Sequence, residues 1–244
     1  MDPKKSFKNT LFIDIETVSG ESNFSLLSDK MKTFWQRKAK NLSNPQNISL
    51  EELYVDRAAL FAEFGKIVVI GMGFLYQNRS KELCLKVKTI AHHDEKSLLL
   101  EFIQFINETY QSRELTLVAH NGKEFDFPYL CRRMLVNGLE IPKPLQLQGK
   151  KPWEVLHQDT MELWKFGDRK VYISLDLLAE LLGISGSKST LTGDKVHGVY
   201  YQEKNLSKIA DYCMEDVVTL AQLYLRYHFL HMVEEKNIDR ITSI

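Results

Sequence analysis

The chain has 244 residues, and its 32 lysine and arginine residues are balanced by 32 aspartate and glutamate residues, so its formal net charge is zero. This length suffices for one sizeable core, and the apolar and charged fractions are those of an ordinary globular protein, so we expect one domain over residues 1–244. A polyanionic partner would have to be met by a local basic patch rather than by the field of the whole molecule.

The cysteines and the hydropathy of the chain argue against a disulfide-rich, a zinc-binding and a membrane-spanning protein. The three cysteines, Cys84, Cys131 and Cys213, lie far apart and outside any CxxC pattern, which argues against a disulfide framework and a zinc site. The longest apolar run, residues 67–76, is about half a membrane span, and Asp14 interrupts the apolar run near the N-terminus. We therefore expect a soluble, cytoplasmic protein with no membrane partner.

In chain order, the hydrophobic pattern predicts strands first and then alternating helices and strands. Residues 10–17 form the first expected strand, and residues 19–45 carry mixed helical and loop signals. The capping box Ser49-Leu50-Glu51-Glu52 begins a helix over about 50–63. The remaining predicted elements are a hairpin of strands 66–76 and 81–90, a helix at about 94–108, a strand at 115–119, a helix from 126 or 128 to 138, a strand at 155–159, and helices at 174–182 and about 206–230.

This order of elements predicts the fold class. Three opening strands followed by helix and strand in alternation favour a single α/β domain with a mixed sheet. The segment at about 19–63 is then a helical insertion between the first and second strands.

Two acids, Asp14 and Glu16, stand one residue apart on the first predicted strand. Because side chains alternate between the faces of a strand, both carboxylates lie on one face, together with Phe12. Two ionised carboxylates in a low-dielectric site repel each other, which raises a pKa unless a cation lies between them. Oxygen ligands without a cysteine or histidine favour magnesium or manganese over zinc. The D-x-E triplet alone arises by chance about once in a protein of this size.

Two further acids lie on predicted helices. Asp126 stands where a loop meets a helix, a position at which aspartate also serves as an N-cap. Tyr212 and Asp216 are four residues apart on the last helix and share one face. The apolar stripe of that helix contains neither of them, so packing does not require them. Each feature alone has an ordinary structural explanation.

Taken together and in this order, the acids resemble the motifs of the ribonuclease H-like, DnaQ-like 3′→5′ exonucleases of the DEDD group. Asp14 and Glu16 match the first motif, D-x-E on the first strand. Asn121-Gly122-Lys123-Glu124-Phe125-Asp126 matches the second motif, and Tyr212-Cys213-Met214-Glu215-Asp216 matches the third, Tyr-x-x-x-Asp. The third motif is typical of the tyrosine branch, because Asp211 stands where the histidine branch has its histidine. The chain is most similar to the exonuclease domains of family B DNA polymerases, here as a free-standing domain.

The resemblance implies a ribonuclease H-like fold with a mixed five-stranded sheet flanked by helices. It also implies a two-metal-ion 3′→5′ exonuclease that releases nucleoside 5′-monophosphates from single-stranded ends. In the family pattern, Asp14 bridges two divalent ions, Mg²⁺ or Mn²⁺, Glu16 and Asp216 complete one ion site, and Asp126 reaches the other ion through water. Tyr212 completes the catalytic set by orienting the attacking water.

Substrate contacts are expected beside these acids. The resemblance places Ile15, Thr17, Asn121, Phe125 and Lys188 among them. Phe125 in the core, Asn121 as a turn former and Lys188 in a solvated loop remain structural alternatives. Asp159, at the end of a predicted strand, is expected to support the site without being a ligand.

The expected partner is a single-stranded nucleic-acid 3′ end, with DNA as the substrate. Because no polymerase domain is expected in these residues, proofreading would need a polymerase or repair partner in trans. The alternatives are an RNA-trimming exoribonuclease of the same fold and a nucleic-acid-binding module without catalysis, since 2′-hydroxyl recognition depends on the shape of the cleft.

Overall fold

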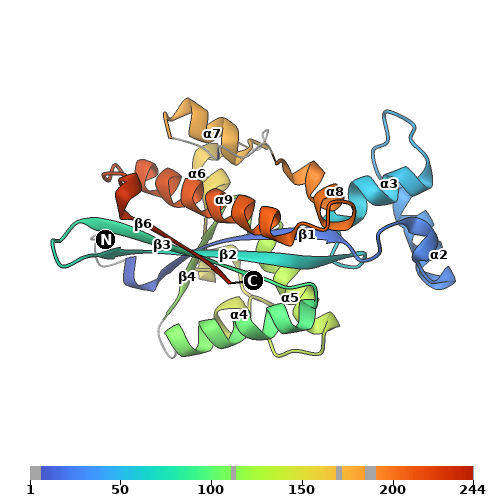
Figure 1. Cartoon of the computed structure of the whole chain (residues 1–244), viewed down its shortest axis with the longest axis horizontal. Helices are drawn as coiled ribbons and strands as arrows, with labels where there is room; N and C mark the ends of the chain where they lie inside the picture. Colours follow the sequence, from blue (N-terminus) through green and yellow to red (C-terminus); the bar gives the residue numbers. More distant parts are fainter. Residues whose placement is uncertain (1–6, 111–113, 169–171, 185–190, 244) are drawn as a thin grey trace.

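A six-stranded mixed sheet forms the centre of the protein in the computed structural model, which describes residues 7–110, 114–168, 172–184 and 191–243 (Figure 1). The strands are β1 (Thr10–Ser19), β2 (Gly65–Gln77), β3 (Leu83–Ala91), β4 (Thr116–Ala119), β5 (Gln158–Asp159) and β6 (Ile238–Ser243). Their order is β5-β4-β1-β2-β3-β6. β2 is antiparallel to β1 and β3, whereas the pairs β1 with β4, β4 with β5, and β3 with β6 are parallel.

The predicted α/β class and the mixed sheet are confirmed, but the predicted number of five strands is wrong. The sixth strand, β6, pairs with the edge of β3. The sequence predicts the long last helix as the end of the fold. A short strand that follows a helix has no periodic signal of its own, and its place depends on a sheet edge formed much earlier in the chain.

Helices cover both faces of the sheet (Figure 1). α9 and the shorter α6, α7 and α8 lie over one face, and α4 and α5 lie over the other. The helices are α2 (Asp29–Ala39), α3 (Leu50–Arg57), α4 (Glu95–Tyr110), α5 (Asp126–Val136), α6 (Thr160–Lys165), α7 (Leu175–Leu181), α8 (Val196–Tyr201) and α9 (Leu206–Tyr227). The helix predicted over 50–63 ends earlier, because α3 passes into a 3-10 turn at Ala58–Leu60.

β1 carries a different set of side chains on each of its faces, as strand alternation predicts. Ile13 and Ile15 belong to the core formed with α4 and α5. Phe12 belongs to the core formed with α9, where its ring lies 5.3 Å from that of Tyr224. Asp14 and Glu16 therefore project from the face that α9 covers.

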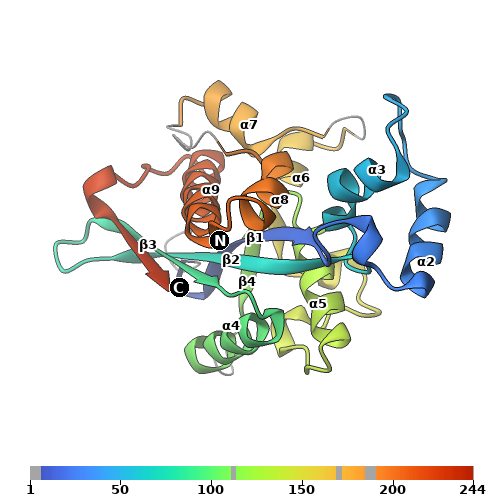
Figure 2. The same ribbon diagram turned by 45° about the vertical axis from the view of Figure 1, so that its right-hand side comes forward.

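The segment between β1 and β2 has a small core of its own. It contains α2 and α3, which lie beyond the end of β1 (Figure 2). The fully buried ring of Trp35 makes edge-on contacts with Tyr54 at 5.3 Å and with Phe64 at 5.0 Å. The capping box predicted at Ser49 is confirmed by reciprocal hydrogen bonds with Glu52.

Among the residues that the structure describes, every helix is too short or too polar to cross a bilayer.

Glycines on β2 allow α9 to approach the sheet closely. Gly71 pairs with Asp14 across the sheet. A Cβ atom at Gly71 would lie only 2.8 Å from Cys213 Sγ and 2.8 Å from Val217 Cγ2 on α9. The missing side chain therefore sets the distance between α9 and the strand that carries Asp14.

We expect Gly71→Ala to lower the free energy of unfolding by roughly 1–3 kcal/mol, because the added methyl group must displace α9 or its side chains. Urea denaturation followed by circular dichroism measures the change. Gly193→Ala is the matched control, since a Cβ there meets no atom within 4 Å. Equal stability of the two variants would contradict the close approach of α9.

Candidate active site

Carboxylates from β1, α5 and α9 come together on the α9 side of the sheet. One oxygen each of Asp14 and Glu16 and the sulfur of Cys213 lie within 4.8 Å of one another. Asp126, at the start of α5, accepts a hydrogen bond on Oδ1 from the backbone N–H of Ile15 at 3.1 Å. Its carboxylate therefore meets β1 at the residue between the two strand acids.

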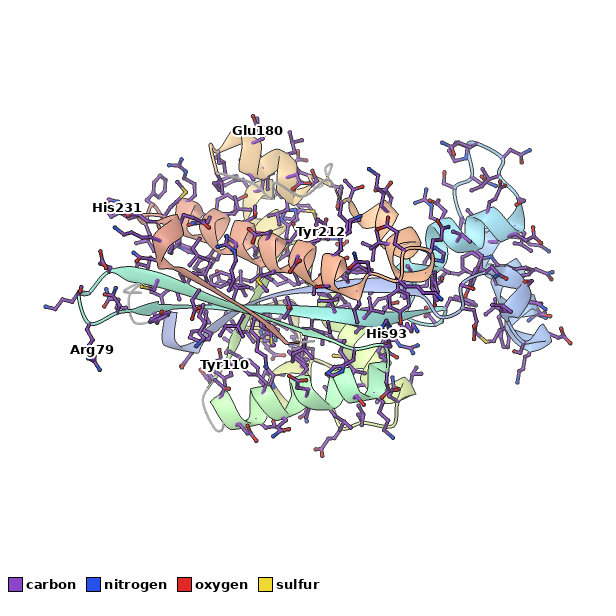
Figure 3. The ribbon with its side chains drawn as sticks, viewed as in Figure 1. Arg79, His93, Tyr110, Glu180, Tyr212 and His231 are labelled. Carbon is purple, nitrogen blue, oxygen red and sulfur yellow. The ribbon has the colours of Figure 1, made fainter. Side chains whose placement is uncertain are left out.

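α9 contributes a tyrosine, a thiol and a fourth carboxylate. Tyr212, labelled on α9 in Figure 3, and Asp216 lie one helical turn apart on one face, as the spacing of four residues predicts, and the charge of Asp216 acts on the Tyr212 hydroxyl. The Cys213 thiol donates to Oδ2 of Asp14 at 3.4 Å. This contact was missed in the sequence, because nothing in the spacing indicates which helix residue faces Asp14.

The electrostatics of the cluster favour protonation of its acids. Burial raises the pKa of both Asp126 and Asp216 to about 7. Burial, followed by the negative charges of Asp126 and Asp216, raises the pKa of Asp14 well above its usual range. The pKa of Glu16 is also raised well above its usual range, mainly by burial and next by the negative charge of Asp14. Within the described part of the chain, no lysine or arginine forms an ion pair with any of the four.

These donors fit a hard divalent cation. Burial and the charge of Asp14 raise the pKa of the Cys213 thiol well above its usual value, so at neutral pH it stays a protonated hydrogen-bond donor. The candidate ligand atoms are then carboxylate oxygens, which suit Mg²⁺ and Mn²⁺ better than Zn²⁺. A cation would also offset the repulsion that raises the pKa values of the acids.

The loop between β4 and α5 positions Asp126. Asn121 adopts a left-handed conformation with φ of 61°, which asparagine tolerates well. A Cβ at Gly122 would overlap the side chain of Ala119 and lie 3.3 Å from Oδ2 of Asp126. The Asn-Gly pair therefore makes the sharp turn that brings Asp126 to β1. Oδ1 of Asn121 is buried and has no hydrogen-bond partner.

Asp159 holds this loop in place. Asp159 is 2% exposed, and its carboxylate accepts backbone N–H bonds from Asn121 at 2.9 Å and Lys123 at 3.1 Å. It also caps α6 by accepting from the N–H groups of Met161 and Glu162 at 2.9 and 3.4 Å. Asp159 therefore joins α6 to the loop that carries Asp126, and its oxygens are engaged by backbone amides.

His120 adds a second tie, which sequence reasoning missed. Its Nε2 lies 2.8 Å from the backbone oxygen of Ile173, and its Nδ1 lies 2.9 Å from the hydroxyl of Thr160. The imidazole thus joins the end of β4 to α6 and to the segment before α7. A single histidine ahead of an Asn-Gly turn gives no signal of this role in the sequence.

The residues predicted to contact substrate are placed as follows. The side chain of Ile15 is 5% exposed and lies in the core. Thr17 donates its hydroxyl to the backbone oxygen of Ala59 at 2.9 Å. Phe125 is half-buried against the core at the start of α5, beside Asp126. Lys188 lies outside the described residues. The substrate roles of these residues stay predictions.

Comparison with known proteins identifies related sequences and folds. A family profile described as "predicted 3′-5′ exonuclease related to the exonuclease domain of PolB" matches residues 60–242. A DNA polymerase of Thermococcus aggregans is 22% identical over 176 residues, covering 63% of this chain and 9% of the polymerase. A DNA polymerase of Thermococcus litoralis is 23% identical over 171 residues, covering 63% of this chain and 10% of the polymerase. The chain thus spans about a tenth of the length of these relatives.

A solved structure shares the fold. The family B DNA polymerase from the hyperthermophilic archaeon Pyrobaculum calidifontis aligns with a TM-score of 0.51 and 15% sequence identity. The alignment covers 90% of this chain and 24% of that chain.

The raised pKa values predict how metal-free stability depends on pH. Asp126 and Asp216 have pKa values of about 7 in the folded protein, against about 3.9 for an unfolded aspartate. Between these values the folded protein binds more protons than the unfolded chain, so its stability falls as the pH rises. In EDTA we expect a lower unfolding temperature at about pH 8 than at about pH 5, and Mg²⁺ should restore more stability at the higher pH.

Asp14→Asn tests the origin of this pH dependence. Removing one charge from the cluster should raise the metal-free unfolding temperature at about pH 8 by about 2–4 °C and flatten the pH profile. Differential scanning calorimetry measures both. A variant with the same steep profile as the natural protein would locate the pH dependence elsewhere.

Asp159→Asn should loosen the loop before Asp126, because an amide replaces one acceptor oxygen with a donor that faces backbone N–H groups. We expect faster tryptic cleavage after Lys123 and weaker Mn²⁺ binding by calorimetry. Glu162→Gln is the matched control, since it removes only the 2.7 Å ion pair between Glu162 and Lys123 Nζ. Similar cleavage and metal affinity in both variants would rule out the positioning role of Asp159.

Proposed function

The chain belongs to the family of predicted 3′-5′ exonucleases related to the exonuclease domain of PolB, and from this premise we propose that it is a metal-dependent 3′→5′ exonuclease acting on single-stranded DNA ends. One observation carries the proposal. Four carboxylates from three separate elements are gathered with raised pKa values and, among the described residues, without a lysine or arginine ion pair.

Asp14, Glu16, Asp126 and Asp216 would hold two divalent ions, Mg²⁺ or Mn²⁺. Such ions, when bound, lower the pKa of water and stabilise the negative charge that develops on phosphodiester oxygens. The protein's own contribution is to fix the ligands before substrate arrives. The Ile15 amide orients Asp126, and the Cys213 thiol orients Asp14.

Tyr212 would act as a hydrogen-bond donor rather than as a base. Burial and the charge of Asp216 raise its pKa, so the phenol stays protonated at neutral pH. Its hydroxyl, one helical turn from Asp216, would orient the attacking water. Loss of this hydroxyl should therefore slow turnover without removing a metal ligand.

The proposed substrate is the 3′ end of single-stranded DNA, and the products are nucleoside 5′-monophosphates. The DNA polymerases among the relatives support DNA as the substrate class. Asn121 and Phe125 adjoin Asp126 and are the proposed contacts with the terminal nucleotide. A polymerase or a repair complex is the proposed partner in trans.

The test uses single-stranded DNA and RNA of one sequence, labelled at either the 5′ or the 3′ end, with Mg²⁺, Mn²⁺ or EDTA. We expect the 3′ label to leave at once as a mononucleotide and the 5′-labelled DNA to shorten stepwise, with no reaction in EDTA. Asp14→Ala should reduce the rate roughly a hundredfold or more, because a misplaced ligand set loses the reacting geometry.

Tyr212→Phe is the matched second variant. It should slow turnover while leaving the Mg²⁺ concentration for half-maximal rate unchanged. Full activity of Asp14→Ala would refute the assignment of the site. Faster shortening of RNA than of DNA would replace the substrate class, and strand binding without any turnover would favour a non-catalytic binding module.

A further inference from the structure

α2, in the segment between β1 and β2, carries an exposed basic stripe. Counted from the first residue of the stripe, Lys30, the others follow after three, four, seven and ten positions, so all of them lie along one face of the helix. All are exposed, whereas Trp35 on the opposite face is fully buried. The stripe consists of Lys30, Thr33, Phe34, Arg37 and Lys40.

The charges of this stripe are not neutralised within the protein. Asp29 is the one acid of α2, and it pairs with Lys32 at 3.8 Å, outside the stripe. Within the described ranges, Lys30, Arg37 and Lys40 form no ion pair. Because the whole chain has a net charge of zero, this excess of positive charge is local. A local patch of this kind is what a neutral protein needs to attract a polyanion.

An aromatic ring lies within the stripe. Phe34 is 42% exposed, and Nζ of Lys30 lies 6.0 Å from the centre of its ring. An exposed phenylalanine between basic residues offers a surface on which a base can stack while the cations meet phosphates. This combination is typical of single-stranded nucleic-acid binding.

The shape and charge around α2 favour the same ligand. A groove of about 550 Å³ runs beside the helix, and the described residues that line it include no carboxylate. Its polar lining consists of Thr33, Gln36, Arg37, Lys40 and Asn44.

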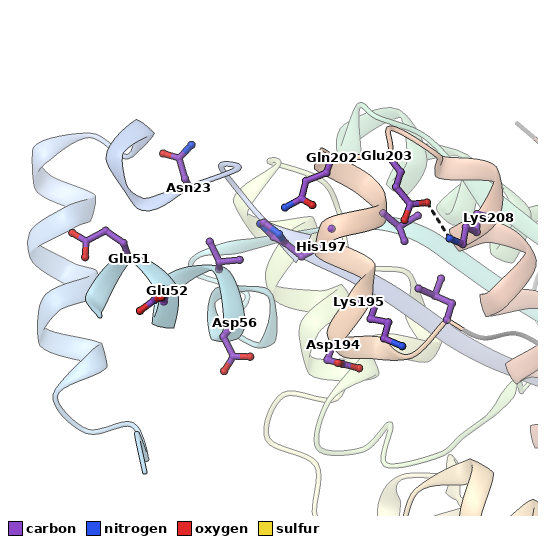
Figure 4. Close-up of a pocket in the computed structure, with 14 residues that line it drawn as sticks. Asn23, Glu51, Glu52, Asp56, Asp194, Lys195, His197, Gln202, Glu203 and Lys208 are labelled. Atoms are coloured by element: carbon purple, nitrogen blue, oxygen red, sulfur yellow. Dashed lines mark hydrogen bonds and ion pairs between the residues drawn. The ribbon is translucent and has the colours of Figure 1, made fainter. Parts of the chain in front are cut away.

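The neighbouring cavity has the opposite character. It lies between α3 and α8 and has a volume of about 730 Å³ (Figure 4). Its charged lining has more carboxylates than ammonium groups and consists of Glu51, Glu52, Asp56, Asp194, Glu203, Lys195 and Lys208. Negative charge on these walls repels phosphates. A nucleic-acid strand that reaches this end of the molecule is therefore attracted to α2 and not to the cavity.

The position of α2 relative to the carboxylate cluster completes the argument. β1 carries Asp14 and Glu16 and leads directly into the segment that contains α2 (Figures 1 and 2). We propose that the exposed face of α2 binds the phosphate backbone of the single-stranded substrate several nucleotides upstream of its 3′ end, with Phe34 stacking on a base. This inference rests on the proposed function for the identity of the strand.

The test measures binding in the Asp14→Ala background, where the strand stays intact. Lys30→Gln/Arg37→Gln should bind single-stranded DNA of about 20 nucleotides roughly 3- to 10-fold more weakly and leave binding of strands of about four nucleotides unchanged. Its binding should also depend less steeply on salt, with the log–log slope smaller by about 1.4 for two lost phosphate contacts. Fluorescence anisotropy with 5′-labelled strands supplies both values.

Matched controls separate charge from position. Arg79→Gln/Lys96→Gln removes two exposed cations, one of them at the tip of the β2–β3 hairpin, at the opposite end of the molecule from α2 (Figure 3). It should bind both strands as the unmodified background does. Phe34→Ala should weaken binding of the long strand without changing the salt slope, because stacking releases no counterions.

The outcomes distinguish this inference from the proposed function. Equal binding of the long strand by both double variants would overturn the role of α2, even where the natural protein hydrolyses DNA. Loss of long-strand binding in the α2 variant alone would support the inference, even where the natural protein shows no hydrolysis. Equal losses on long and short strands would place the contact at the 3′ end and overturn the upstream assignment.

Discussion

The crowding of carboxylates around Asp14 is the interaction on which the site depends. β1 lies inside the sheet between β2 and β4, so Asp14 and Glu16 cannot separate without disrupting the sheet. α9 lies so close to β2 that Asp216 faces the same space, and the Ile15 amide holds Asp126 there as well. Because the backbone cannot move these carboxylates apart, their mutual repulsion can be reduced only by protonation or by a bound cation. The rigidity that makes the metal-free site destabilising to the fold would also make the site selective for small divalent ions.

Two buried aspartates near this site differ in how many hydrogen bonds their oxygens accept. Asp159 accepts four backbone N–H bonds, so its negative charge is compensated by the β4–α5 loop and by the first turn of α6. Oδ1 of Asp126 accepts a hydrogen bond from the Ile15 amide. Oδ2 lies on the side of Gly122 and is available to bind a ligand. A saturated carboxylate supports structure, whereas an unsaturated one can bind a ligand. Asp126 and Asp159 carry the same charge, so charge alone does not distinguish them.

Local patterns in the sequence predicted the parts of the protein that depend on neighbours along the chain. Alternation along β1 placed Asp14 and Glu16 on one face, and the capping box at Ser49 marked a real helix start. What the sequence did not reveal depends on contacts between distant segments. The β6 strand needs the edge of β3, and the contact between Cys213 and Asp14 joins residues 199 positions apart. No periodicity encodes which helix face meets which strand residue.

Placing the groups that attract phosphates on α2, away from the carboxylates, would solve an electrostatic difficulty that the carboxylate cluster creates. If the proposed function holds, a nucleic-acid strand that approaches the four acids would meet repulsion until cations were bound, and the overall charge of zero offers no long-range attraction. Positive charge placed close to the acids would form ion pairs with them and compete with the metal ions. On α2, the basic side chains lie in a segment with its own core around Trp35, away from the carboxylates. In that position they would attract phosphates while leaving the proposed metal ligands free.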